Sequence, residues 1–188
     1  MKRRTAVIAV LVSLMPIGQP LVIGIATAVI FSVPQRALAE SAIFYFNRAI
    51  DKRDEGDYYG AISDYNKAIE INPNYAFAYY NRGNIKGRDL EDYSGALSDL
   101  NQAIEIDPNY DQMYISRCLV KDRLKDYYGA ISDCNKAIEI NPKDAQAYIN
   151  RGVSKFRIGD KKGACFDARQ GKSLGSSNGS KAVELLCK

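Results

Sequence analysis

Two kinds of charged side chain recur at regular intervals in this sequence and are the first candidates for chemistry. An arginine and an aspartate each appear four times: Arg48, Arg82, Arg117 and Arg151, with Asp64, Asp99, Asp133 and Asp167. Arginines at regular intervals could form a ladder that binds an anionic ligand. Because the acids recur just as regularly, we expect ion pairs within a scaffold instead, which contribute only about 0 to 1 kcal/mol each at exposed sites.

Side chains that carry enzymatic or metal chemistry are scarce. The chain contains no histidine, which is the commonest general base and the commonest metal ligand. Without histidine, no Ser–His or Cys–His nucleophilic pair exists. The four cysteines, Cys118, Cys134, Cys165 and Cys187, include no close pair of the kind that binds zinc. We therefore expect a non-catalytic protein with no metal and no cofactor.

The net charge of +4 arises entirely from the N-terminal segment. From Glu40 onward the chain carries 22 basic and 22 acidic residues. Binding to nucleic acid needs a basic excess on one face of the protein, because the phosphates must be neutralised. The neutral balance therefore predicts no nucleic-acid partner.

The N-terminal segment has the pattern of a secretory signal peptide. The basic stretch Lys2–Arg4 precedes an uncharged run over residues 5–33, and Ala37–Ala39 forms a cleavage site of the A-x-A type. We predict a signal peptide over residues 1–39 and a mature chain in a periplasm, in a lumen or outside the cell. Two prolines divide the apolar run into halves that are each shorter than the roughly 20 residues of a membrane span. The alternative is a retained membrane anchor formed by residues 5–33, which is the only way we expect this chain to contact a membrane.

The rest of the chain is built from a repeated stretch. Asp57–Asn74 returns as Asp92–Asn109 and again as Asp126–Lys143, at offsets of 35 and 34 residues, a period typical of stacked repeats. Within each unit, residues at helical spacing are interrupted by a turn and then resume. A proline closes the second segment because proline cannot continue a helix. Each unit is therefore predicted to be helix, turn, helix.

Counting each unit from its first residue shows which positions recur. The units begin at Ala42, Ala76, Asp111 and Ala145. Tyrosine stands at position four, a small residue at positions eight and twenty-seven, alanine at twenty, and proline at thirty-two in three units: Tyr45, Tyr79, Tyr114 and Tyr148; Ala49, Gly83, Cys118 and Gly152; Ala61, Ala96, Ala130 and Ala164; Ala68, Ala103, Ala137 and Gly171; Pro73, Pro108 and Pro142. We expect the small residues to let paired helices approach closely.

This joint pattern resembles the tetratricopeptide repeat (TPR) family. It departs from the family in having tyrosine for tryptophan at position four, arginine for leucine at position seven, and one extra residue in the second unit near residues 88–91. The resemblance implies an all-α, right-handed superhelix of about four repeats. The predicted divisions are repeats at 40–75, 76–110, 111–144 and 145–174, the last degenerate, and a capping helix at 178–188.

The resemblance also implies a concave groove, lined by the first helix of each repeat, that binds a peptide. The residues expected to line it are Phe46, Asn47, Ile50, Tyr80, Asn81, Asn84, Arg88, Ile115, Leu119, Arg123, Asn150, Val153 and Arg157. Apolar residues beside arginines favour a protein or peptide partner with acidic or carboxylate groups. We therefore expect a scaffold for protein–protein interaction outside the cytoplasm. The alternative is a membrane-tethered assembly factor for an envelope or thylakoid complex.

An exported chain with an even number of cysteines is expected to form disulfides. Cys165 stands at a position that should face the following helix, and for the fourth repeat that helix is the cap, which carries Cys187. We therefore expect a bond between these two residues. Cys118 and Cys134 lie on facing helices of one repeat and form a second candidate pair. The alternative for this second pair is that both are small core residues.

Overall fold

The computed structural model describes residues 35–188, with side chains from residue 39 onward. This part of the chain forms nine helices and no strand. Their bounds are α1 Gln35–Asp54, α2 Tyr58–Ile71, α3 Ala76–Arg88, α4 Tyr93–Ile106, α5 Asp111–Arg123, α6 Tyr127–Ile140, α7 Ala145–Arg157, α8 Lys161–Ser173 and α9 Gly179–Leu186. The architecture confirms the predicted all-α class.

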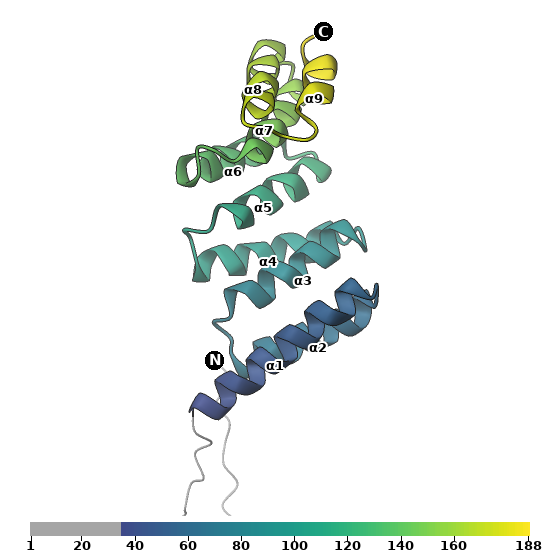
Figure 1. Cartoon of the computed structure of the whole chain (residues 1–188), viewed down its shortest axis with the longest axis vertical. Helices are drawn as coiled ribbons and strands as arrows, with labels where there is room; N and C mark the ends of the chain where they lie inside the picture. Colours follow the sequence, from purple (N-terminus) through teal and green to yellow (C-terminus); the bar gives the residue numbers. More distant parts are fainter. Residues whose placement is uncertain (1–34) are drawn as a thin grey trace, which may run out of the picture. The chain divides into compact units, whose positions relative to one another are not determined.

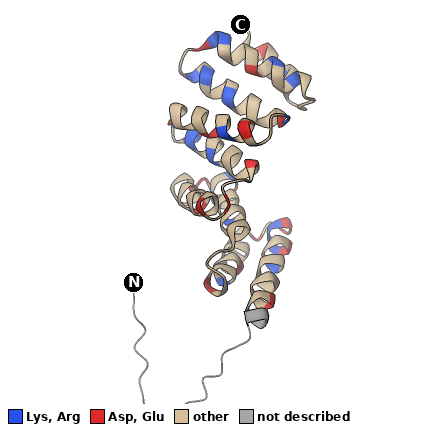
Figure 2. Cartoon of the chain, turned by 90° about the vertical axis from the view of Figure 1, so that its left-hand side faces the viewer, with Lys and Arg blue, Asp and Glu red and all other residues tan. Residues whose placement is uncertain are grey.

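Consecutive helices pack in pairs, and the pairs stack in chain order (Figure 1). We call α1, α3, α5 and α7 the A helices and α2, α4, α6 and α8 the B helices. Within a pair, A packs on B; between pairs, each B helix packs on the next A helix, and α9 packs on α8 and α7. Acidic and basic residues are interspersed along most of the described helices (Figure 2).

The predicted signal peptide lies mostly outside the described residues, and its predicted cleavage point after Ala39 falls within α1. Cleavage there would leave α1 beginning at Glu40. Among residues 35–188, no helix is both long enough and apolar enough to span a membrane.

An aspartate directly before each B helix caps it. The Asp57 carboxylate accepts a hydrogen bond from the backbone N–H of Gly60 at 2.9 Å, which satisfies one of the unpaired N–H groups of the first turn. The other three repeats use Asp92, Asp126 and Asp160 in the same way. A Cβ atom at Gly60 would lie 1.9 Å from the Asp57 carboxylate, so a larger residue there would require the capping side chain to shift.

Small side chains hold the paired helices close together, as the sequence predicts. Ala49, Ala61 and Ala68 are fully buried. A Cβ atom at Gly83 would lie 3.2 Å from the Cβ of Asp99, and one at Gly171 would lie 2.5 Å from the Cδ1 of Ile149. Larger residues at these positions would force the helices apart, because protein interiors have few voids to absorb the added volume.

The turns follow the repeat with one exception. Three residues separate α1 from α2, α5 from α6 and α7 from α8, whereas residues 89–92 separate α3 from α4. The extra residue of the second repeat therefore lies in this turn, within the predicted segment. Glu91 takes a positive φ of 54° there.

Candidate functional site

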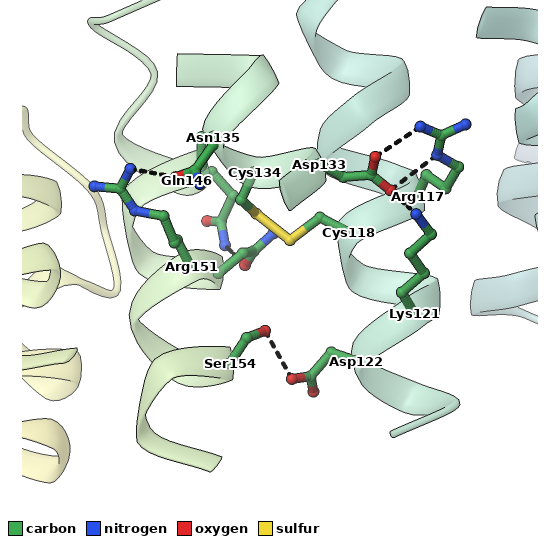
Figure 3. The surroundings of a disulfide bond; sticks show 12 residues. Arg117, Cys118, Lys121, Asp122, Asp133, Cys134, Asn135, Gln146, Arg151 and Ser154 are labelled. Carbon is green, nitrogen blue, oxygen red and sulfur yellow. Dashed lines mark hydrogen bonds and ion pairs between the residues drawn. A yellow bond between two sulfur atoms is a disulfide. The ribbon is translucent and has the colours of Figure 1, made fainter. Parts of the chain in front are cut away.

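The recurring arginines and aspartates form ion pairs between the two helices of each repeat. Arg117 donates from Nε and Nη2 to the two carboxylate oxygens of Asp133, at 2.8 and 2.6 Å, and the ammonium of Lys121 lies 2.8 Å from the same carboxylate (Figure 3). The other repeats contain the equivalent groups Arg48–Asp64–Lys52, Arg82–Asp99–Lys86 and Arg151–Asp167–Lys155. The scaffold interpretation is confirmed. Because all four aspartates are buried, removing one partner costs more than at an exposed pair.

These arginines also join neighbouring repeats. The Nη1 groups of Arg82, Arg117 and Arg151 donate to asparagines on the preceding B helix, at 2.5, 2.9 and 2.7 Å; the acceptors are Asn66, Asn101 and Asn135. Each guanidinium also lies 5.0 to 5.5 Å from the ring centre of the tyrosine three residues before it, a cation–π distance. The two departures from the family pattern, tyrosine at position four and arginine at position seven, are therefore coupled in space.

The first of these ion pairs changes the acidity of its carboxyl group. The hydrogen bond from Arg48 lowers the pKa of Asp64 to about 2, and Lys52 adds to the shift, although burial opposes it. The carboxylate raises the pKa of Arg48 in turn. Both groups are therefore charged at neutral pH.

Three adjoining hollows run along the A helices. The first lies between α1 and α3, the second between α3 and α5, and the third between α5 and α7, with volumes of about 420, 160 and 340 Å³. Asn84 and Arg88 line both the first and the second hollow, and Leu119 and Arg123 line both the second and the third. Because neighbouring hollows share side chains, they form one continuous surface, which we call the groove.

Most of the residues predicted for the groove line it. They are Tyr80, Asn81, Asn84, Arg88, Leu119, Arg123, Asn150, Val153 and Arg157. The remaining four do not. Ile115 is only 5 % exposed and packs in the core with Ala137 and Ala147, so its assignment to the groove is corrected.

The other three exceptions all come from α1. Phe46 stacks on Tyr75 at 4.8 Å, in the turn that leads to the second repeat. Ile50 packs against the core of the first repeat. Asn47 is exposed but lines none of the three hollows. Helical spacing alone placed these residues on one stripe, and the packing of α1 against the next repeat decided which of them remain accessible.

The groove carries a row of arginines of a different kind from those of the scaffold. Arg88, Arg123 and Arg157 are exposed, and within residues 39–188 none has a carboxylate at salt-bridge distance. Asp122 in the third hollow instead accepts a hydrogen bond from the buried Ser154 hydroxyl at 2.9 Å (Figure 3). The guanidinium groups are therefore available to an anionic ligand.

Several residues that line the groove were not predicted from the sequence, including Arg53, Asp89, Glu91 and Lys125. Tyr58, Tyr93 and Tyr127, the first residues of three B helices, each line one hollow. Their signal was a tyrosine that recurs at position seventeen. Gly87 lines the second hollow, and a Cβ atom there would lie 3.2 Å from Cγ2 of Val120. No sequence signal marked this close approach.

The structure brings both candidate cysteine pairs together. Cys118 on α5 is bonded to Cys134 on α6, with 5.6 Å between the Cα atoms (Figure 3). Cys165 on α8 is bonded to Cys187, directly after α9, with 4.6 Å between the Cα atoms. The first bond joins two helices of one repeat beside the third hollow, and the second ties the short last helix to α8.

The chain matches family models for these repeats. A TPR repeat model matches residues 51–89, and a tetratricopeptide repeat model matches residues 78–110 and 112–144. No curated protein matches the sequence significantly.

Several solved structures share the fold. The MamA protein is 22 % identical with a TM-score of 0.71, covering 78 % of this chain and 81 % of that one. YrrB, described as a TPR protein with an unusual peptide-binding site, is 21 % identical with a TM-score of 0.67, covering 80 % of each chain. The first TPR of Spaghetti (RPAP3), bound to the HSP90 peptide SRMEEVD, is 24 % identical with a TM-score of 0.56, covering 59 % of this chain and 89 % of that one. Repeat models, helix pairs and stacking order agree, and the chain belongs to the tetratricopeptide repeat family.

Proposed function

We propose that this protein is a non-catalytic scaffold that binds an extended, acidic segment of a partner protein in the groove. The observation that carries the proposal is the row formed by Arg88, Arg123 and Arg157. Arginine binds carboxylates through two parallel hydrogen bonds, and these three side chains have no such partner among the described residues. Carboxylates of a bound peptide would supply it.

The hollows between the arginines favour a peptide that alternates acidic and apolar residues. Tyr80 lies in the first hollow, Leu119 in the second and third, and Val153 in the third. Apolar side chains of a ligand would be removed from water there, and the arginines would fix its register. The structurally similar Spaghetti domain binds a peptide, SRMEEVD, that contains acidic residues, which is consistent with this class of ligand.

We further propose that the protein acts outside the cytoplasm after removal of residues 1–39. Two disulfides support this location, because such bonds persist in oxidising compartments. The intact mass of the protein from its native host, with peptide mapping under non-reducing conditions, tests the proposal. A mass that includes Met1 would favour the membrane-anchored alternative, and free thiols at all four cysteines would contradict export.

The groove is tested with two labelled peptides, one alternating glutamate and leucine and one in which glutamine replaces every glutamate. We expect the acidic peptide to bind more tightly, and Arg123→Glu with Arg157→Glu to weaken its binding at least about tenfold, which corresponds to about 1.4 kcal/mol. The matched control is Lys143→Glu with Lys181→Glu, which changes the net charge equally at exposed sites outside the groove. Equal loss in both double variants would mean that net charge, and not the groove, governs binding.

A further inference from the structure

The first helix of the stack exposes a face that is buried in every later repeat. Positions three and ten of the A helices in repeats two to four are almost fully buried; they are Ala78, Met113 and Ala147, and Ile85, Val120 and Ser154. Ile85, for example, packs in the core with Tyr65 of the preceding B helix. In α1 these two positions hold Phe44, which is 57 % exposed, and Asp51, which is also exposed.

The outer face of α1 carries carboxylates as well as apolar side chains, and the Arg48 guanidinium, paired with Asp64, lies 5.3 Å from the centre of the Phe44 ring. Asp51 lies in the last turn of α1 and Glu55 directly follows the helix. The backbone N–H of Glu55 donates to the Asp51 carbonyl at 3.0 Å, as in a helical turn, so both residues lie on one side. Among residues 39–188 neither carboxylate has a basic group at salt-bridge distance. Ile43, beside Phe44, is 49 % exposed. We call Ile43, Phe44, Asp51 and Glu55 the α1 outer face.

The last B helix departs from the other three at two positions that meet a following repeat and at one exposed position. Where α2, α4 and α6 carry the asparagines that accept from the next repeat's arginine, α8 carries Arg169. The leading tyrosine becomes Lys161, and the exposed serine of the other B helices becomes Phe166, which is 57 % exposed. The chemistry of this face thus changes from neutral to basic and aromatic.

These residues surround a hollow at the junction of α8 and α9. It has a volume of about 380 Å³ and is lined by Lys161, Lys162, Cys165, Phe166, Arg169, Leu186, Cys187 and Lys188. Within the described residues, none of the four cationic side chains in it has a carboxylate at salt-bridge distance. Basic residues recur on the helices nearest the C-terminus in Figure 2. We call this site the end hollow.

We propose that the α1 outer face of one copy of this chain docks on the end hollow of another. The two surfaces have opposite charge, each exposes an aromatic side chain, and both lie where the stack would otherwise continue. In this contact Phe44 enters the hollow beside Phe166, and Asp51 and Glu55 face the basic residues around it. Charge complementarity of this kind both attracts the surfaces and fixes their register.

The contact is not a simple continuation of the superhelix. The short helix α9 already covers part of α8, and an in-register fifth repeat would bring Arg48 of the second copy against Arg169. The outer face of α1 must therefore sit at the α8–α9 junction instead. Because the two surfaces differ, the contact is head-to-tail. It generates open chains of copies unless the rotation between successive copies closes a ring.

Sedimentation velocity over a range of protein concentrations tests the proposal. The protein is expressed from Met1 and used in the N-terminal form that the host produces, as determined by intact mass. We expect association at low salt that weakens at about 0.5 M salt, since screening shortens the reach of exposed charges. A wild-type protein that remains monomeric at low salt at every concentration overturns the proposal.

Charge exchange provides the sharper arm of the experiment. Asp51→Lys with Glu55→Lys, and separately Lys161→Glu, Lys162→Glu and Arg169→Glu, should each leave the protein monomeric. A mixture of the two variants should associate again, because each then offers the charge that the other lacks. If the mixture stays monomeric, complementary docking is wrong.

Two single variants are expected to fold normally, because each introduces the residue that the other repeats carry at the same position. They therefore distinguish a loss of docking from a loss of folding. Phe166→Ser and Arg169→Asn should each weaken association at least about threefold, without changing the helical circular dichroism. The Lys143→Glu with Lys181→Glu variant should associate like wild type. The alternative occupant of the end hollow is a membrane surface, which is tested by sedimentation with anionic phosphatidylglycerol vesicles. If the protein does not self-associate but binds the vesicles through Lys161, Lys162 and Arg169, the end hollow is a membrane-binding surface and the proposal is wrong.

Discussion

The molecule carries two rows of arginines that differ in what surrounds them. Arg117, like its counterparts in the other repeats, lies between the two helices of its repeat, where it pairs with a buried aspartate and stacks on a tyrosine. Arg123, six residues further along α5, is exposed in the groove and has no carboxylate partner in the described residues. The same kind of side chain is therefore a structural tie on one face of a helix, and on another face it is exposed without a carboxylate partner among the described residues.

Regular recurrence of a residue type does not by itself mark a functional site in this protein. The first row repeats because every repeat must join its own two helices and then join its neighbour. The second row contributes little to packing, and the residues around it vary from repeat to repeat. Substitutions in the first row should therefore change stability, and substitutions in the second row should change binding.

Removing a buried carboxylate of the first row should have the largest effect. We expect Asp133→Ala to lower the free energy of unfolding by about 3 kcal/mol, because the positive charges of Arg117 and Lys121 would be left without their partner. Urea denaturation measures this change. Glu105→Ala, an exposed acid on the neighbouring repeat, is the matched control and should stay within about 0.5 kcal/mol of wild type. Equal small effects in both variants would contradict the structural role of the row.

The disulfide of the third repeat should have the next largest effect. It closes a loop with a sequence separation of 16 residues, and the loss of such a loop costs about 3 kcal/mol. Cys118→Ala with Cys134→Ala should therefore destabilise the protein, and dithiothreitol should destabilise wild type more than this variant. Cys165→Ala with Cys187→Ala should mainly increase hydrogen exchange in α9. Stability that is unchanged by reduction would show that neither bond forms in solution.

Acid should remove the contribution of the Arg48–Asp64 ion pair of the first row. The pKa of Asp64 is about 2 in the folded protein and about 3.9 for an unfolded aspartate. Its contribution is therefore complete above pH 4 and is lost as the pH falls toward 2, on the order of 2 kcal/mol. Unfolding of wild type and Asp64→Asn across this range should converge at low pH. Parallel curves, or an NMR titration of the Asp64 carboxyl near pH 4, would contradict the shift.

Removing a buried hydroxyl that has no hydrogen-bond partner should raise the stability of the protein by a smaller amount. The Tyr65 ring is fully buried against Phe46, and its hydroxyl has no hydrogen-bond partner among the described residues. Burial also raises the pKa of this hydroxyl to about 12. Tyr65→Phe should stabilise the protein by about 1 kcal/mol, because an unsatisfied buried hydroxyl carries a desolvation cost of about 1 to 3 kcal/mol. Thermal unfolding measures the gain, and a loss of stability would mean that the hydroxyl has a partner in solution.

The smallest change in stability should come from the groove row. Arg123→Ala removes an exposed side chain without a carboxylate partner, so we expect the free energy of unfolding to stay within about 0.5 kcal/mol of wild type. Urea denaturation beside Asp133→Ala makes the contrast direct. A loss comparable to that of Asp133→Ala would mean that the two rows do not differ as proposed.

The sequence predicted most of the scaffold. The small residues at fixed positions and the prolines act locally or between adjacent helices, and their physical effects can be read from spacing. The same reasoning ranked Cys165 with Cys187, which the structure brings together. The signal peptide stays a prediction, because residues 1–34 lie outside the described part of the chain.

The groove could be predicted only in part. A stripe at i, i+4 and i+8 identifies one side of a helix, but it does not show which side chains a neighbouring repeat will cover. Ile115 lies on the predicted stripe and is buried in the core, whereas Tyr127 begins a B helix and lines the third hollow. Accessibility depends on contacts between repeats, which spacing within one helix does not contain.

The sequence by itself determined the repeat and the family, because these follow from local propensities that recur with a fixed period. Only the tertiary structure decided which arginines are paired and which are free. Arg117 and Arg123 lie six residues apart on the same helix. Packing places a buried carboxylate within 2.6 Å of Arg117 and leaves Arg123 exposed to solvent. An arginine at either site is equally charged, and it is the neighbouring helix that determines whether that charge holds the fold together or remains available to a ligand.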